Sequence, residues 1–130
     1  MSLAKMVSEN EISEKSRTIY QEIKKAFGIS FVPNLFKAMG SNPEHLEAAW
    51  NQVKTTLLAP GELTRREKEM VALAVSATNN CKYCILAHSA ALKGLGLSEK
   101  GLVELMAVVG LFNHLNKFAD GLMVEPDLGV

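Results

Sequence analysis

Apolar residues recur at helical spacing along most of this chain. Ile19, Ile23 and Phe27 lie four residues apart, so their side chains fall on one face of a helix. Gly28 follows directly and is typical of the position just past a helix C-terminus. The pattern predicts a first helix over about 14–27.

Capping signals place the next helices. A short helical piece over 35–39 leads to Asn42 and Pro43, which are typical of an N-cap and a first helical position. The helix they open carries an apolar face and ends at Pro60; that face holds Leu46, Trp50, Val53 and Leu57. Thr64 to Glu67 then matches a capping box, which predicts a helix over about 65–78 that is mostly buried.

The remaining sequence predicts two more helices. One runs from Cys81 to Leu92 and stops at Gly94-Leu95-Gly96. Ser98 caps the last and longest, which is apolar nearly all round over 102–112 and so needs cover on more than one side. No run alternates between apolar and polar residues as a strand would. We expect an all-α fold, a compact bundle of about five to seven helices, with the cysteines at the N-terminus of a buried helix.

Length and charge narrow the class of protein. The 130 residues suffice for a single domain over 1–130, in which the first 30 residues are the least informative. Fourteen basic residues balance fourteen acidic ones, so there is no field to attract nucleic acid. No stretch approaches the roughly 18 apolar residues of a membrane span. We therefore expect a cytoplasmic protein with no nucleic-acid or membrane partner.

The chemistry is concentrated in one short segment. The only two cysteines, Cys81 and Cys84, are followed by His88, and on a helix these three positions stack along one face. His88 lies one turn after Cys84, where an imidazole can take the thiol proton or stabilise the thiolate. We predict that Cys84 attacks and that Cys81 then closes a disulfide with it.

The same residues allow other interpretations. Free cysteines are often plain buried packing residues. Cys81, Cys84, His88 and Glu69 are of suitable type to bind zinc, although no second cysteine pair completes the common pattern. Haem attachment needs a histidine where Ile85 stands, and thioredoxin-like folds place the motif after a strand, so both are excluded. We expect no cofactor and no metal.

The motif resembles a known family. Glu69, Cys81, Cys84 and His88, at these spacings, are similar to the alkylhydroperoxidase D branch of the carboxymuconolactone decarboxylase superfamily. Looser similarity extends from Val32-Pro33-Asn34 to Asp120-Gly121-Leu122 and so covers most of the chain. The resemblance implies an all-α domain that assembles into dimers, trimers or hexamers, with the cysteine pair in a pocket near a subunit contact.

The resemblance also implies roles for the four residues. The second cysteine, Cys84, would be peroxidatic, Cys81 would resolve it, and His88 and Glu69 would relay protons. Well-known members carry a histidine where this chain has Tyr83, and a phenol cannot act as a base near neutral pH. The reductant would be an external dithiol, either lipoyl-bearing or thioredoxin-like.

These observations lead to one main hypothesis and two others. The main one is a peroxidase that reduces organic hydroperoxides through a Cys84/Cys81 cycle. The second is a cofactor-independent decarboxylase or isomerase that uses His88 and Glu69 as acid and base. The third is a non-enzymatic redox-sensing or metal-binding module.

Overall fold

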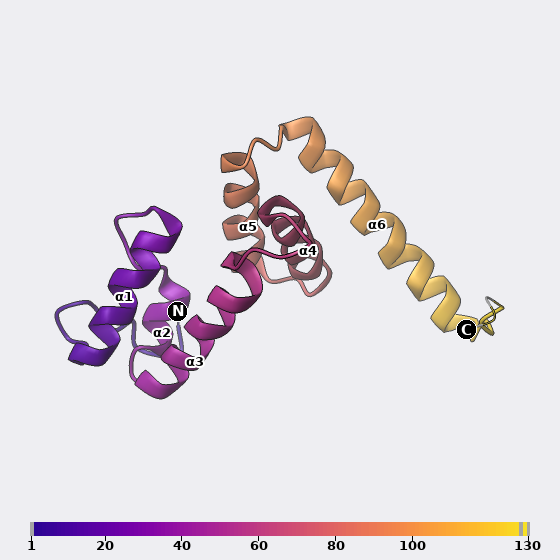
Figure 1. The fold of residues 1–130 in the computed structure, drawn as a ribbon. Coiled ribbons are helices and arrows are strands. Elements are labelled where there is room, and N and C mark those ends of the chain that lie inside the picture. The colour runs from indigo at the N-terminus through magenta and orange to yellow at the C-terminus, as the bar shows by residue number, and fades with distance from the viewer. Residues whose placement is uncertain (1, 128, 130) are drawn as a thin grey trace. The chain divides into compact units, whose positions relative to one another are not determined.

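The computed structural model describes residues 2–127 and 129, and over these residues the fold is helical, with no strand (Figure 1). The all-α prediction is therefore confirmed. The elements, in chain order, are α1 (Glu14–Phe27), α2 (Asn34–Met39), α3 (Pro43–Val53), the π-helical turn η1 (Lys54–Leu58), α4 (Arg65–Thr78), α5 (Lys82–Gly94) and α6 (Glu99–Gly121).

The chain separates into two compact units, residues 1–59 and residues 60–130, and each is described by itself. The prediction of one domain over 1–130 stays a prediction. Each candidate site residue belongs to the second unit, so the first is described only briefly.

The first unit is built around Trp50 of α3. The rings of Phe27 and Phe36 meet the Trp50 ring edge-on, with centroids 5.7 and 5.8 Å away, and the Trp50 Nε1 donates a hydrogen bond to Glu22. Edge-to-face packing is favourable for aromatic rings, and a satisfied indole N–H can be buried at little cost. The buried residues of this core are Val7, Ile12, Ile19, Tyr20, Ile23, Val32, Phe36, Leu46 and Trp50.

The second unit begins with the expected capping box. The Glu67 backbone N–H donates to the Thr64 hydroxyl, and the Thr64 backbone N–H donates to the Glu67 carboxylate, at 3.2 and 2.6 Å. Two backbone donors that a helix leaves unpaired are thus satisfied, which fixes where α4 begins. Helix α4 packs against α5 and α6. Its buried core is small and consists of Leu73, Leu92 and Leu97.

A tight turn between α4 and α5 positions the cysteines. Asn79 caps α4, Asn80 has a φ of 57°, and Cys81 is the N-cap of α5. Asparagine tolerates this left-handed conformation better than most residues. The turn therefore reverses the chain in two residues and leaves Cys81 at the very start of a helix.

Burial of α4 and α5 is lower than the sequence pattern suggested. On α4, Val71 and Val75 are more than half exposed, which corrects the expectation of a mostly buried helix. On α5, Leu92 is the one buried residue, so in this chain the Cys-x-x-Cys motif opens a half-exposed helix. The physical reason is that α5 and α6 cover only part of the surface of α4, so its other apolar positions stay uncovered.

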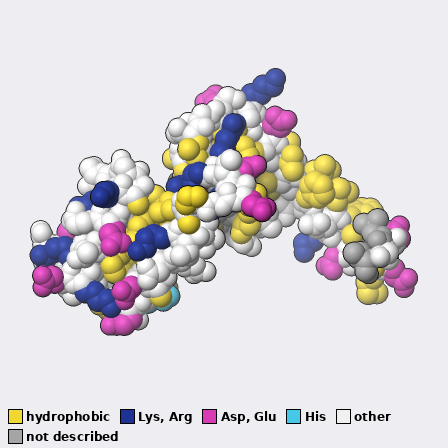
Figure 2. All heavy atoms as spheres, viewed as in Figure 1, with side chains coloured by type: hydrophobic (Ala, Val, Ile, Leu, Met, Phe, Trp, Pro, Cys, Tyr) yellow, Lys and Arg dark blue, Asp and Glu magenta, His cyan; other side chains and the backbone are white. Residues whose placement is uncertain are grey.

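Helix α6 is the most exposed apolar element. Ser98 caps it as expected, accepting a hydrogen bond from the Gly101 N–H, but none of its residues is buried. Figure 2 shows apolar side chains gathered over this helix; those more than 40% exposed include Val103, Val108, Leu111, Phe112, Leu115 and Phe118. Of the helices in the described ranges, none is both long and apolar enough to cross a membrane.

Leu73 tests the importance of the small α4–α5 core. Its side chain is fully buried, so Leu73→Ala is expected to lower the free energy of unfolding by about 2–5 kcal/mol through lost transfer energy and the cavity left behind. Urea denaturation followed by circular dichroism measures this change. Arg66→Ala, at an exposed position of the same helix, is the control and should change stability by no more than about 0.5 kcal/mol. Equal losses in the two variants would contradict the assignment of the core.

Candidate active site

Glu69 is a buried carboxylate on α4. Its side chain is 1% exposed, in a chain where most acidic residues lie at the surface. One turn earlier on the same helix, Arg65 donates two hydrogen bonds to a single carboxylate oxygen, from Nε at 2.9 Å and from Nη2 at 2.7 Å to Oε1. A buried charge is tolerated only when it is paired and hydrogen-bonded, and this pair meets both conditions.

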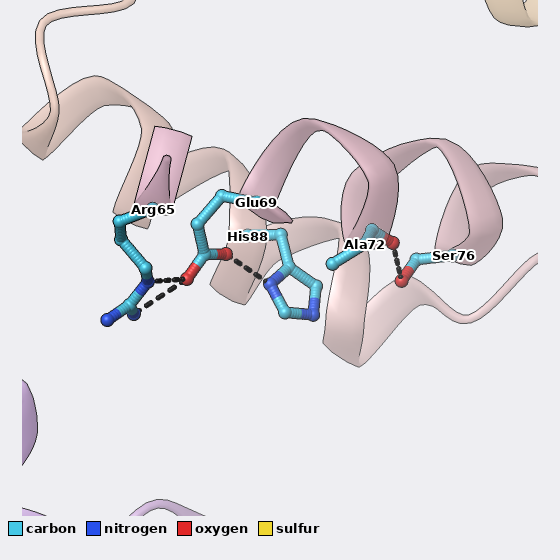
Figure 3. A network of polar contacts seen from close by, with 5 residues as sticks. All are labelled: Arg65, Glu69, Ala72, Ser76 and His88. Carbon is cyan, nitrogen blue, oxygen red and sulfur yellow. Dashed lines mark hydrogen bonds and ion pairs between the residues drawn. The ribbon is translucent and has the colours of Figure 1, made fainter. Parts of the chain in front are cut away.

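His88 occupies the other oxygen of Glu69. Its Nδ1 lies 2.6 Å from Glu69 Oε2, so the carboxylate joins α4 to α5. Figure 3 shows Arg65 and His88 approaching Glu69 from opposite sides. An ionised carboxylate can only accept hydrogen bonds, so the proton between the two groups is on Nδ1. In the neutral ring, Nε2 is then the unprotonated nitrogen, which can act as a base.

Opposing effects set the ionisation of Glu69. Burial acts to raise the pKa of its carboxyl, but the hydrogen bonds from His88 and Arg65 outweigh burial and hold the pKa below the ordinary value of 4.5. Glu69 is therefore an anion at neutral pH. It carries a fixed negative charge directly beside the imidazole.

The two cysteines are free, half-buried thiols whose sulfurs interact. The Cys84 S–H, followed by the backbone N–H groups of Cys84 and Tyr83, lowers the pKa of the Cys81 thiol. The same contact with Cys81, together with burial, raises the pKa of the Cys84 thiol, which the Ser76 hydroxyl partly opposes. Of the two thiols, Cys81 at the helix start is therefore the more acidic, while Cys84 keeps its proton.

The four predicted residues lie on the neighbouring helices α4 and α5 and on the turn between them. They form two separate pairs. Glu69 contacts His88 through a hydrogen bond, and the Cys81 thiol interacts with the Cys84 thiol. Within the described part of the chain, no hydrogen bond joins His88 to either sulfur. The roles predicted for these residues stay predictions.

Comparison with known proteins identifies the family. The carboxymuconolactone decarboxylase family matches this chain over residues 44–123, well over half of its length and including the whole site. The chain belongs to the carboxymuconolactone decarboxylase family. The resemblance stated from the motif is thereby confirmed.

A solved structure extends the comparison to the whole fold. The alkylhydroperoxidase AhpD core from Rhodospirillum rubrum superposes with a TM-score of 0.93 at 29% sequence identity, covering 98% of this chain and 95% of that one. This similarity supports the assignment of the chain as an AhpD-like member of the carboxymuconolactone decarboxylase family. The fold is the one expected from the sequence.

Two further relatives match over smaller shares of the chains. An alkyl hydroperoxide reductase of Mycobacterium tuberculosis is 32% identical over 81 residues, which are 62% of this chain and 23% of that protein. The alkyl hydroperoxide reductase AhpD of Coxiella burnetii is 26% identical over 116 residues, which are 87% of this chain and 65% of that protein. The chain thus spans about a quarter of the first relative and less than two thirds of the second.

The sequence analysis did not predict two residues of this site, Arg65 and Ser76. Arg65 precedes Glu69 by four positions and Ser76 follows it by seven, so both share its face of α4. That spacing was the available signal. Ser76 is buried, and its hydroxyl donates to the Ala72 carbonyl at 2.6 Å, as Figure 3 also shows.

The zinc alternative gains no support from the geometry. Over residues 2–127 and 129, no three histidine, cysteine or acidic side chains converge closely enough to hold a metal ion. The arrangement is instead suited to proton transfer at one pair and thiol chemistry at the other.

The interaction between the two thiols generates a prediction for Cys81. Cys84→Ala removes the donor that contributes most to lowering the pKa of the Cys81 thiol, so this pKa is expected to rise toward its ordinary value. The pH dependence of iodoacetamide alkylation of the remaining thiol measures it. Cys84→Ser, whose hydroxyl can still donate, should retain part of the lowering. An identical alkylation profile for Cys81 in both variants would contradict the contact.

Proposed function

We propose that this protein is a thiol-dependent peroxidase that reduces organic hydroperoxides through a dithiol–disulfide cycle. The observation that carries the proposal is the ionised, buried Glu69 that holds His88 one turn after Cys84 on α5. The names of the relatives, alkyl hydroperoxide reductases and alkylhydroperoxidase, support the same class of reaction.

The proposed cycle has three balanced steps. The Cys84 thiolate attacks the terminal oxygen of the hydroperoxide, the O–O bond breaks, and the alkoxide takes up a proton and leaves as an alcohol. Cys84 is then a sulfenic acid, which Cys81 attacks to form a disulfide and release water. An external dithiol supplies two electrons and two protons to restore both thiols.

Proton transfer is the contribution of His88 in this cycle. Since Cys84 keeps its proton in the resting pair, it needs a base before it can attack. His88 Nε2 is free to take that proton, and the Glu69 carboxylate stabilises the imidazolium that forms. The same proton can then pass to the departing alkoxide.

The remaining requirements of the cycle concern partners. We propose an external dithiol of the lipoyl or thioredoxin-like type as reductant, and the cytoplasm as the compartment that keeps such dithiols reduced. The exposed apolar side chains of α6 support assembly with further copies of this chain, as a dimer, trimer or hexamer. The balanced charge of the chain gives no reason to propose a nucleic-acid partner.

A second candidate is acid–base chemistry without the thiols. The family match itself and the Glu69–His88 pair favour it, because a carboxylate-bound imidazole can act as general base in a cofactor-independent decarboxylation or isomerisation. In that case the cysteines would be spectators. Activity toward a lactone or keto-acid substrate that survives loss of both thiols would identify it.

Exposure of the reduced protein to an organic hydroperoxide tests the main proposal. Cumene hydroperoxide should remove both thiols within seconds as one intramolecular disulfide, detected by thiol titration and intact mass. In Cys81→Ser the reaction should stop at a sulfenic acid on Cys84, and Cys84→Ser should not consume peroxide.

His88→Ala should slow the oxidation by roughly 10²–10⁴-fold, the usual size of a general-base contribution. Free thiols in the wild-type protein after this treatment would refute the peroxidase function. A sulfenic acid on Cys81 in the Cys84→Ser variant would reverse the assignment of the attacking thiol.

A further inference from the structure

The contact between Arg65 and Glu69 has a geometry that constrains the neighbouring histidine. Both guanidinium donors converge on Oε1, and Oε2 is left for His88. Because the Glu69 side chain is buried, Arg65 is the group that satisfies Oε1 in the folded protein. The orientation of the carboxylate is therefore fixed from the side opposite His88.

We propose that Arg65 is a positioning residue of this site, which holds the Glu69 carboxylate so that its second oxygen keeps His88 in the Nδ1–H form, with Nε2 unprotonated. The inference deepens the proposed function and rests on it for the task of Nε2, which is to accept the Cys84 proton. It concerns a residue that acts through Glu69 and His88 and does not itself contact a thiol.

Charge supports this role as well as geometry. Among the described residues, the charged or titratable groups that interact with Glu69 are Arg65 from α4 and His88 from α5. Helix α6 also packs on α4 but contributes no such group. Without Arg65, burial of Glu69 would be opposed by His88 alone. The carboxyl would then protonate more readily, and a protonated carboxyl can donate to Nδ1 and reverse the tautomer of the ring.

An arginine suits this position better than a lysine. The guanidinium presents Nε–H and Nη2–H side by side, so it can place two donors on one oxygen and restrict rotation of the carboxylate. A lysine ammonium would keep the charge but lose this two-donor contact. The side chain of Arg65 is one-third exposed, so it can be replaced without leaving a closed cavity.

The test compares Arg65→Met and Arg65→Lys with the wild-type protein by NMR. In the wild type, ¹⁵N shifts of the neutral His88 ring should show a single Nδ1–H tautomer, and the ¹³C signal of the Glu69 carboxyl should titrate below pH 4.5. In Arg65→Met the carboxyl titration should move to higher pH and the single tautomer should be lost. Arg65→Lys should restore the titration more fully than the tautomer, since it returns the charge but not the two-donor contact.

Arg66→Met is the matched control, because it removes the same charge from the next position of α4, where the side chain is exposed. It should leave both signals unchanged. An Arg65→Met protein that keeps the wild-type tautomer and carboxyl titration would overturn the proposal, as would equal shifts in Arg66→Met.

Circular dichroism checks that each variant folds. If Arg65→Met unfolds, the spectra of the wild type and of Arg65→Lys test the proposal. A wild-type His88 ring that carries its proton on Nε2 overturns it. A partial loss of the Nδ1–H tautomer in Arg65→Lys supports it. None of these measurements uses a peroxide. A protein that fails to reduce hydroperoxides can therefore still confirm the role of Arg65. Likewise, a protein in which Arg65 has no such role can still be a peroxidase.

Discussion

The candidate site depends on one buried carboxylate. A charged group removed from water is costly unless its lone pairs are satisfied, and Glu69 meets that requirement through one partner on its own helix and one on the next. The bond to His88 joins α4 to α5 beside the small core of Leu73 and Leu92. Because that core is small, the polar contact contributes to the register of the two helices as well as to chemistry.

The same arrangement separates two kinds of chemistry within a few turns of helix. Cys81 gains acidity through the Cys84 thiol and through nearby backbone N–H groups, whereas Cys84 loses acidity through the same contact with Cys81 and through burial. In such a pair the two thiols lose their protons in a fixed order, Cys81 before Cys84. In the proposed cycle, the unprotonated nitrogen of His88 takes the proton of Cys84.

Local sequence rules account for most of the fold. Thr64, Ser98 and Asn42 each accept from the backbone where a capping residue was expected, because caps depend on neighbours three positions away. Spacing likewise identified the face that carries the candidate site residues. Periodicity alone could not indicate how much of α4, α5 and α6 is covered, since an apolar position looks the same whether it faces the core or solvent.

The sequence also could not predict which side chains of the site pair with each other. The spacing of Cys84 and His88 allows a direct contact, and the same is true of Arg65 and Glu69 on α4. The structure selects the Glu69–His88 and Arg65–Glu69 pairs, because a buried carboxylate binds the strongest donors within reach. Side-chain rotamers and burial decide this competition, and neither can be obtained from residue spacing.

The most direct test of the ionised Glu69 is the pH dependence of stability in the wild type and in Glu69→Gln. Because the pKa of Glu69 in the folded protein lies below 4.5, its ionisation stabilises the native state above that pH, and this contribution is lost as the pH falls through the folded-state pKa. Urea denaturation between pH 7 and pH 3 should show the wild type more stable by roughly 1.5–3 kcal/mol at neutral pH, with the difference shrinking on acidification. A difference that grows on acidification would mean that Glu69 is protonated in the native protein, and would contradict the account.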